Sequence, residues 1–433
     1  MSSLSATELP RTRIADGAAA RLLAVACLCG FAFFAQADAL SNRLSGPVPV
    51  TILSVLIAGV PAATLLVLLA PTGERPRAVG ADGARLILML MAWAVFCWTL
   101  SAHKTEGLRY LIELSTAVGP ALCLLIVADR PAHLHAIGWA MICATVVAAL
   151  TVLVEQKTHT RIFSTASAAI TADFDGVARS AGASDQNPTT AAQCLMAGAA
   201  LALGLLFAGE KRGRILLAGA VAVGAGALAL MSARSAILGF GAGAGIVLLS
   251  FRRHRAFPLM LIAAALVGAV GLWIAPPTLW ERFAAIGDFG KDQTLFRRVT
   301  YLRIGVDLIG QSPVWGVGPG NYPLHYMLYA YRYLPGRILM PRELHNTYLD
   351  TMTEFGVVGF VIAALLVVHA LLQLRRALAG SEALRRIAFG VLVALVALLV
   401  GAFFMPHKDL RYLWLVLAMA IQCGRIRAAE RRA

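Results

Sequence analysis

Long apolar runs recur along the chain and are separated by short polar segments. A helix needs roughly 20 apolar residues to cross a bilayer, and the runs have about that length. Backbone polar groups inside lipid must be satisfied within the segment itself, which favours helices over any other structure. The pattern predicts twelve membrane-spanning helices, at residues 21–37, 48–70, 85–101, 108–128, 134–154, 188–208, 213–231, 235–250, 257–275, 346–372, 385–404 and 410–424.

Two connections between these runs are much longer than the others. One covers residues 155–187 and the other residues 276–345. Long loops in compact proteins are usually functional. The chain is therefore expected to have three parts: nine helices with the smaller loop (1–275), a large loop (276–345), and three helices with a tail (346–433).

Composition and charge support an all-α polytopic membrane protein. Hydrophobic residues make up 59% of the chain and charged residues 14%, whereas a soluble domain carries about 25% charged residues. Just over half of the 38 Lys and Arg residues fall in connections on one side of the predicted membrane. Positive residues mark the cytoplasmic side, so both termini are expected there and the two long loops outside. This distribution explains the net charge of +15 without nucleic acid as a partner.

Arginines on the two outer loops oppose that trend and indicate an anionic ligand. Guanidinium groups match phosphate oxygens with paired hydrogen bonds. The two loops carry eleven lysines and arginines: Lys157, Arg161, Arg179, Arg282, Lys291, Arg297, Arg298, Arg303, Arg332, Arg337 and Arg342. A solvated, salt-bridged loop is the alternative explanation for any one of them.

Arg234 is the sharpest individual candidate. It is the only charge in the apolar stretch "GALALMSARSAILGFGAG", where serines flank it. An arginine at that depth is costly, which favours a functional role, here in binding an anion. An arginine that merely reaches up to the membrane surface is the alternative.

His345 stands in "RELHNTYLDTMTEFG", residues 341–355, where polar residues open an apolar run. A helix N-terminus and nearby cations favour the neutral imidazole, which can accept a proton. Tyr348 is expected on the same face of the helix. Asp350 and Glu354 share another face and are expected to orient neighbouring helices. No metal or nucleotide site is expected, because no motif has the required spacing.

Four segments together resemble the O-antigen ligase and polymerase superfamily. They are "RSAGASDQNPTTAAQ" (179–193), "MSARSAILG" (231–239), "SPVWGVGPGNY" (312–322) and "HNTYLDTMTEFGVVGF" (345–360). Each motif is loose by itself, but the four occur in the family's order and on the expected side of the membrane. The resemblance covers roughly residues 155–420.

The resemblance implies a GT-C-like glycosyltransferase in the bacterial inner membrane, with its active site on the periplasmic side. Such a ligase moves O-antigen glycan from undecaprenyl diphosphate to lipid A-core oligosaccharide, with inversion and without a metal or cofactor. It implies that His345 is the general base, with Asn346, Tyr348 and Arg297 in support. It also implies diphosphate binding by Arg161, Arg179, Arg234 and Arg298.

Three alternatives stay open at this point. An O-antigen polymerase or a protein O-oligosaccharyltransferase of the same superfamily shares the donor and differs in the acceptor. A secondary transporter for an anion or a lipid-linked glycan also suits twelve spans, but no internal repeat is visible in the sequence. A non-catalytic scaffold explains the hydrophobicity and leaves the outer arginines without a role.

Overall fold

The computed structural model describes residues 9–46, 50–70, 82–163, 180–211, 213–255, 257–273, 280, 293–335 and 340–432. Within these ranges the chain forms helices and no strand. The helices are α1 (Leu9–Phe34), α2 (Asp38–Ser45), α3 (Ile52–Leu69), α4 (Asp82–Leu100), α5 (Lys104–Val127), α6 (Pro131–Thr158), α8 (Pro188–Phe207), α9 (Arg214–Leu230), α10 (Arg234–Ser250), α11 (Phe257–Trp273), α13 (Gln293–Gln311), α14 (Tyr322–Tyr326), the 3-10 turn η2 (Tyr329–Tyr331), α15 (Thr347–Ala377), α16 (Glu382–Gly401) and α17 (Arg411–Glu430).

The helices overlap all twelve predicted spans. Among the described residues, eight are long and apolar enough to cross a membrane: α1, α3, α4, α5, α6, α8, α15 and α16. Three more, α9, α10 and α11, are shorter apolar helices. The last predicted span lies on α17, whose two ends carry arginines. The prediction of an all-α polytopic membrane protein is confirmed, and length and hydropathy by themselves support eight of its twelve spans.

The centre of the bundle is formed by α8 and α16. The span in α8 is the most buried of the eight, with 78% of its residues inside the protein. Glycines let the two backbones approach closely: a Cβ atom at Gly204 would lie 2.6 Å from the Cα atom of Gly390. Small residues at such crossings are typical of membrane helices, which cannot rely on the hydrophobic effect for their association.

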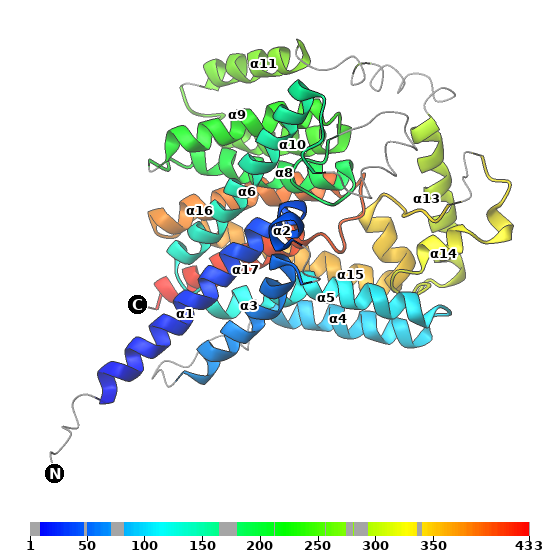
Figure 1. Cartoon of the computed structure of the whole chain (residues 1–433), viewed down its shortest axis with the longest axis horizontal. Coiled ribbons are helices and arrows are strands. Elements are labelled where there is room, and N and C mark those ends of the chain that lie inside the picture. Colours follow the sequence, from blue (N-terminus) through cyan, green and yellow to red (C-terminus); the bar gives the residue numbers. More distant parts are fainter. Residues whose placement is uncertain are drawn as a thin grey trace.

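The two ends of the bundle differ in what they carry (Figure 1). The start of α1 and the end of α17 lie at one end, and α13 and α14 lie at the other, where α13 runs across the direction of α15. We refer to the end that carries α13, α14 and the start of α15 as the loop end. The three-part division of the chain at 275 and 345 stays a prediction, although α13 and α14 do form a separate layer at the loop end.

Candidate functional site

The motifs at residues 312–322 and 345–360 contact each other at a break in α15. Gly356 interrupts the helix with a φ of +66°. The segment after α13 enters this break, where Val357 N donates to Pro313 O at 2.8 Å and Val317 N donates to Thr353 O at 2.9 Å. Backbone groups that the broken helix leaves without helical partners are therefore satisfied by the loop. The break and the loop form one unit although they are separated by α14 and η2.

Glycine is required on both sides of this contact. A Cβ atom at Gly356 would lie 2.1 Å from Val314 O, and one at Gly316 would lie 2.5 Å from the backbone carbon of Glu354. Gly316 also has a positive φ, +71°. Residues with a side chain are strained at such φ values, so steric space and backbone conformation both select glycine.

His345 lies directly before α15, on a backbone with a φ of +58°. Its Nδ1 lies 3.0 Å from the carbonyl oxygen of Glu343, and its ring centroid lies 5.6 Å from that of Tyr301. When Nδ1 carries the hydrogen and donates it to Glu343, Nε2 has a free lone pair. The half-buried imidazole can therefore act as a proton acceptor through Nε2.

Burial and two nearby arginines keep this histidine neutral. Burial, followed by the positive charge of Arg298 and then that of Arg342, lowers the pKa of His345 to about 4. The ring is consequently neutral near pH 7. Arg297 and Arg298 also act electrostatically on Tyr301, whose pKa is raised by burial despite these nearby cations. Arg298 thus lies close enough to act electrostatically on His345, and Arg297 acts on Tyr301, whose ring packs against the imidazole.

Asn346 and Tyr348 hold the start of α15 in place. The Asn346 side chain caps the helix, because its Oδ1 accepts the backbone N–H groups of Tyr348 and Leu349, both at 3.1 Å. The Tyr348 hydroxyl donates to Leu399 O at 2.6 Å, and its ring packs on Phe403 with centroids 4.5 Å apart. Both residues therefore fix the position of the segment that carries His345, in line with the supporting role expected of them.

Two more of the candidate arginines lie at the start of α10 and after the end of α6. Arg234 begins α10, and its neighbour Ser235 accepts a hydrogen bond from Gln193 of α8 at 2.9 Å. Arg161 follows α6 in a loop that is held to α2, because Arg43 donates to Ile162 O at 3.2 Å. Described contacts near Arg234 therefore lead to α8, and those near Arg161 lead to α2. The fourth arginine assigned to the diphosphate, Arg179, lies outside the described residues.

A buried ion cluster is the functional feature that the sequence analysis missed. Lys408 Nζ lies 2.7 Å from Asp350 Oδ2 and 2.5 Å from Glu354 Oε2. The two carboxylates were expected to orient neighbouring helices, and no role was predicted for Lys408. Two acids four residues apart on an apolar helix were the available signal, since buried carboxylates in a membrane require a cation.

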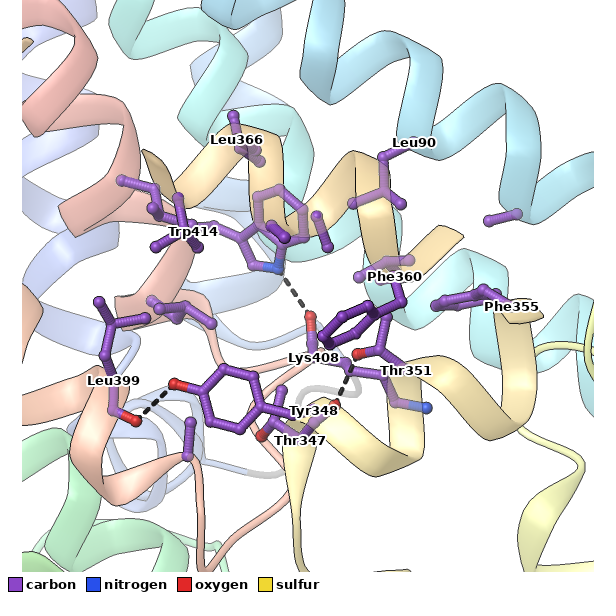
Figure 2. Close-up of a pocket in the computed structure, with 18 of the residues that line it drawn as sticks. Leu90, Thr347, Tyr348, Thr351, Phe355, Phe360, Leu366, Leu399, Lys408 and Trp414 are labelled. Atoms are coloured by element: carbon purple, nitrogen blue, oxygen red, sulfur yellow. Dashed lines mark hydrogen bonds between the residues drawn. The ribbon is translucent and has the colours of Figure 1, made fainter. Parts of the chain in front are cut away.

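An apolar cavity of about 270 Å³ lies beside the start of α15 (Figure 2). Its walls come from α4, α5, α15, α16 and α17, and they include Leu90, Phe360, Leu366 and Trp414. The polar atoms along it are satisfied within the protein: for example, Trp414 Nε1 donates to Lys408 O at 2.7 Å. A cavity of this kind suits a hydrocarbon chain and offers little to a polar ligand.

The cavity also reaches the membrane-facing surface of the bundle. Val368 contributes to its lining and is 51% exposed on the outer face of α15. At its other extreme the lining includes Thr347 and Tyr348, which directly follow the segment of His345 and Asn346. A chain that entered from the bilayer would therefore lead toward the histidine.

Comparison with known proteins gives this geometry a family context. Residues 219–364 match the family model for O-antigen ligase. Over 128 residues the chain is 31% identical to the exopolysaccharide production protein ExoQ of Rhizobium meliloti (strain 1021), a match that covers 29% of either protein. The family region contains Arg234, Arg298, His345 and both sides of the contact at Gly356. The resemblance seen in the motifs is thus supported by a family match that covers residues 219–364, about a third of the chain.

Proposed function

We propose that this protein is an inverting glycosyltransferase that moves a glycan from a polyprenyl diphosphate carrier to a second lipid-linked sugar. In its most specific form, the proposal is an O-antigen ligase that uses undecaprenyl diphosphate-linked O-antigen as donor and lipid A-core oligosaccharide as acceptor. The observation that carries it is the position of neutral His345 beside Arg298, next to an apolar cavity that reaches the bilayer.

The proposed reaction has one bond-forming and one bond-breaking step. An acceptor hydroxyl attacks the anomeric carbon of the donor sugar from the side opposite the diphosphate. The bond between that carbon and the diphosphate oxygen breaks, and the electron pair leaves with the diphosphate. The hydroxyl proton passes to Nε2 of His345. The diphosphate already activates the donor, so the protein supplies charge stabilisation and a base, and neither step calls for a metal or cofactor.

Arginines stabilise the departing diphosphate in this proposal. Arg298 is assigned first because it acts electrostatically on His345, and Arg297 is its neighbour on α13. Arg161, Arg179 and Arg234 stay assigned to the same role on the strength of the motifs. Removal of one charge-assisted contact to a developing anion costs on the order of 3 kcal/mol, or about 100-fold in rate.

Donor binding would also increase the basicity of His345. In the protein without donor, Arg298 and Arg342 oppose protonation of the ring. A bound diphosphate compensates these charges, which raises the pKa of the imidazole when the substrate is in place. The base would then become competent only in the presence of the group that has to leave.

The same proposal orients the protein in the bacterial inner membrane. Both termini would be cytoplasmic, and the loop end with α13, α14 and His345 would face the periplasm. The distribution of positive residues along the sequence supports this orientation. The carrier's hydrocarbon chain would occupy the apolar cavity and leave its diphosphate at the membrane surface.

A polymerase is the second candidate, and the similarity to an exopolysaccharide production protein favours it. A polymerase would use the same donor and transfer the growing glycan to another carrier-linked unit. A protein O-oligosaccharyltransferase would transfer it to a protein side chain instead. A transporter for an anion or a lipid-linked glycan remains a candidate from another class.

One reconstitution separates these functions. Purified protein in lipid vesicles would receive undecaprenyl diphosphate-linked glycan together with lipid A-core or a protein acceptor, with a chelator and without nucleotide. A glycan-shifted lipid A-core band supports the ligase, and longer glycan on the carrier supports the polymerase. A glycan-modified protein acceptor supports the oligosaccharyltransferase. Movement of the substrate across vesicles without any product supports transport and contradicts the proposal.

A further inference from the structure

Lys408 is a buried cation in the segment that leads into α17. The exposed fractions of the side chains are 8% for Lys408, 6% for Asp350 and 3% for Glu354. The ammonium also lies over two aromatic rings, 5.2 Å from the centroid of Tyr110 and 5.3 Å from that of Phe355. Burial of three charges carries a large desolvation cost, so such a cluster is weak evidence for stability and invites another role.

Glu354 connects this cluster to the loop that enters the break in α15. Its Oε2 accepts the backbone N–H of Gly320 at 2.8 Å, and its Oε1 accepts that of Tyr322 at 3.1 Å. Tyr322 is the first residue of α14. One carboxylate therefore binds Lys408 on one side and the start of α14 on the other.

Tyr322 extends the connection to the helix that carries the arginines. Its buried hydroxyl donates to the carbonyl oxygen of Tyr301 in α13 at 2.9 Å. The Tyr301 ring in turn packs against the imidazole of His345, and Arg297 and Arg298 lie about one helical turn before Tyr301. An uninterrupted series of direct contacts thus leads from Lys408 to the proposed active site.

We propose that Lys408 is a positioning residue for His345 and Arg298, and that it acts through Glu354, Tyr322 and Tyr301. The inference rests on the proposed function, because it concerns the geometry of that site. Lys408 touches no substrate in this account. Its charge orients Glu354, Glu354 fixes the start of α14, and Tyr322 holds α13 at the distance from α15 that the reaction needs.

The test uses variants that keep the buried net charge constant. Lys408→Met combined with Asp350→Asn removes one positive and one negative charge and leaves Glu354 in place. Tyr322→Phe deletes only the hydroxyl that binds Tyr301. Lys104→Met is the matched control, because Lys104 is an exposed lysine that bonds to backbone oxygens of the preceding turn.

The proposal predicts a loss of kcat with little change in the KM for the donor. Displacement of reacting groups by about 1 Å can cost on the order of 100-fold in rate, so the charge-cluster variant is expected to be 10- to 100-fold slower. Tyr322→Phe is expected to be roughly 2- to 10-fold slower, which corresponds to the net free energy of one hydrogen bond. A protein that carries all three substitutions should be no slower than the charge-cluster variant alone, because both sets of changes act on one series of contacts.

Hydrogen exchange provides a readout that does not depend on activity. Backbone amides of residues 293–311 should exchange faster in both variants than in the wild type and in Lys104→Met. A Tyr322→Phe protein with full rate and unchanged exchange in α13 would overturn the inference, even if the charge-cluster variant does not fold. A combined variant whose loss of rate equals the product of the two separate losses would also overturn the inference. Wild-type protein that transfers no glycan to any acceptor would instead contradict the proposed function, while the exchange measurement would still test the coupling.

Discussion

The imidazole of His345 and the phenol ring of Tyr301 lie 5.6 Å apart, centroid to centroid, at an angle of 54°. This contact joins the start of α15 to α13, two elements that belong to different parts of the chain. The histidine is also held by its own backbone, with a φ of +58°, and by its Nδ1 contact with Glu343 O. The imidazole is therefore held in one orientation against α13, the helix that carries Arg298.

Replacement of His345 by asparagine tests its role as the base. Asparagine tolerates positive φ, so the backbone should stay as it is and the melting temperature should hardly change. Loss of a general base is expected to lower kcat by about 10²- to 10⁴-fold. The measurement is the initial rate of glycan transfer at saturating donor. A folded His345→Asn protein with wild-type kcat would remove His345 from the mechanism.

Glu343 gives the protein a pH-dependent stability. Loss of hydration, followed by the negative charges of Asp409 and Asp350, raises the pKa of Glu343 to about 8. The unfolded chain has an ordinary carboxyl pKa of about 4.3. Between these values the folded state binds more protons, so this contribution to stability is present at low pH and is lost as the pH rises toward 8.

Glu343→Gln should remove that dependence. The melting temperature of the variant relative to the wild type is expected to increase as the pH is raised from 6 to 9. The measurement is thermal unfolding in detergent at several pH values. A difference in melting temperature that stays constant over this range would show that Glu343 has no raised pKa.

Gly356→Ala tests the contact between the loop and the break in α15. The new Cβ atom would lie 2.1 Å from Val314 O, on a backbone with positive φ. Destabilisation by more than about 2 kcal/mol and loss of transfer are expected. Gly241→Ala is the matched control, since a Cβ atom there meets open space within α10. Equal melting temperatures for the two variants would contradict the requirement for glycine.

Ala363→Trp tests the apolar cavity as the site of the carrier's hydrocarbon chain. Ala363 lines the cavity, so an indole at this position would fill part of it. The KM for a full-length carrier should rise by about tenfold or more, equivalent to ~1.4 kcal/mol of binding, with a smaller change in kcat. Ala62→Trp, at an exposed position of α3, is the control. Equal KM values for the two variants would place the chain elsewhere.

The spans were predictable from the sequence because hydropathy and length depend on local composition. All twelve predicted spans overlap helices. The motifs also assigned His345 and Arg298 to one site, and that assignment stays a prediction. Other features depend on tertiary contacts that no local pattern contains. The break at Gly356 looks like an ordinary glycine in an apolar run, and only the loop at Gly316 shows why the helix is interrupted there.

Lys408 shows most clearly what the sequence pattern could not predict. Its position in a short outer connection made it a minor exception to the charge distribution, and its partners are more than 50 residues away in the sequence. Asp350 and Glu354 required a cation, but the sequence could not tell which of the outer lysines and arginines supplied it. Long-range pairing of this kind is decided by how helices pack, and hydropathy carries no information about it.

The central claim is that a lipid-borne diphosphate binds between Arg298 and His345. Histidine-selective NMR of the purified protein, with His345→Asn to assign the signal, measures it most directly. Without donor, His345 should titrate with a pKa of about 4. With saturating polyprenyl diphosphate the account predicts a pKa shifted upward, toward the ordinary value near 6.5. A His345 pKa that is unchanged when the carrier is bound would contradict it.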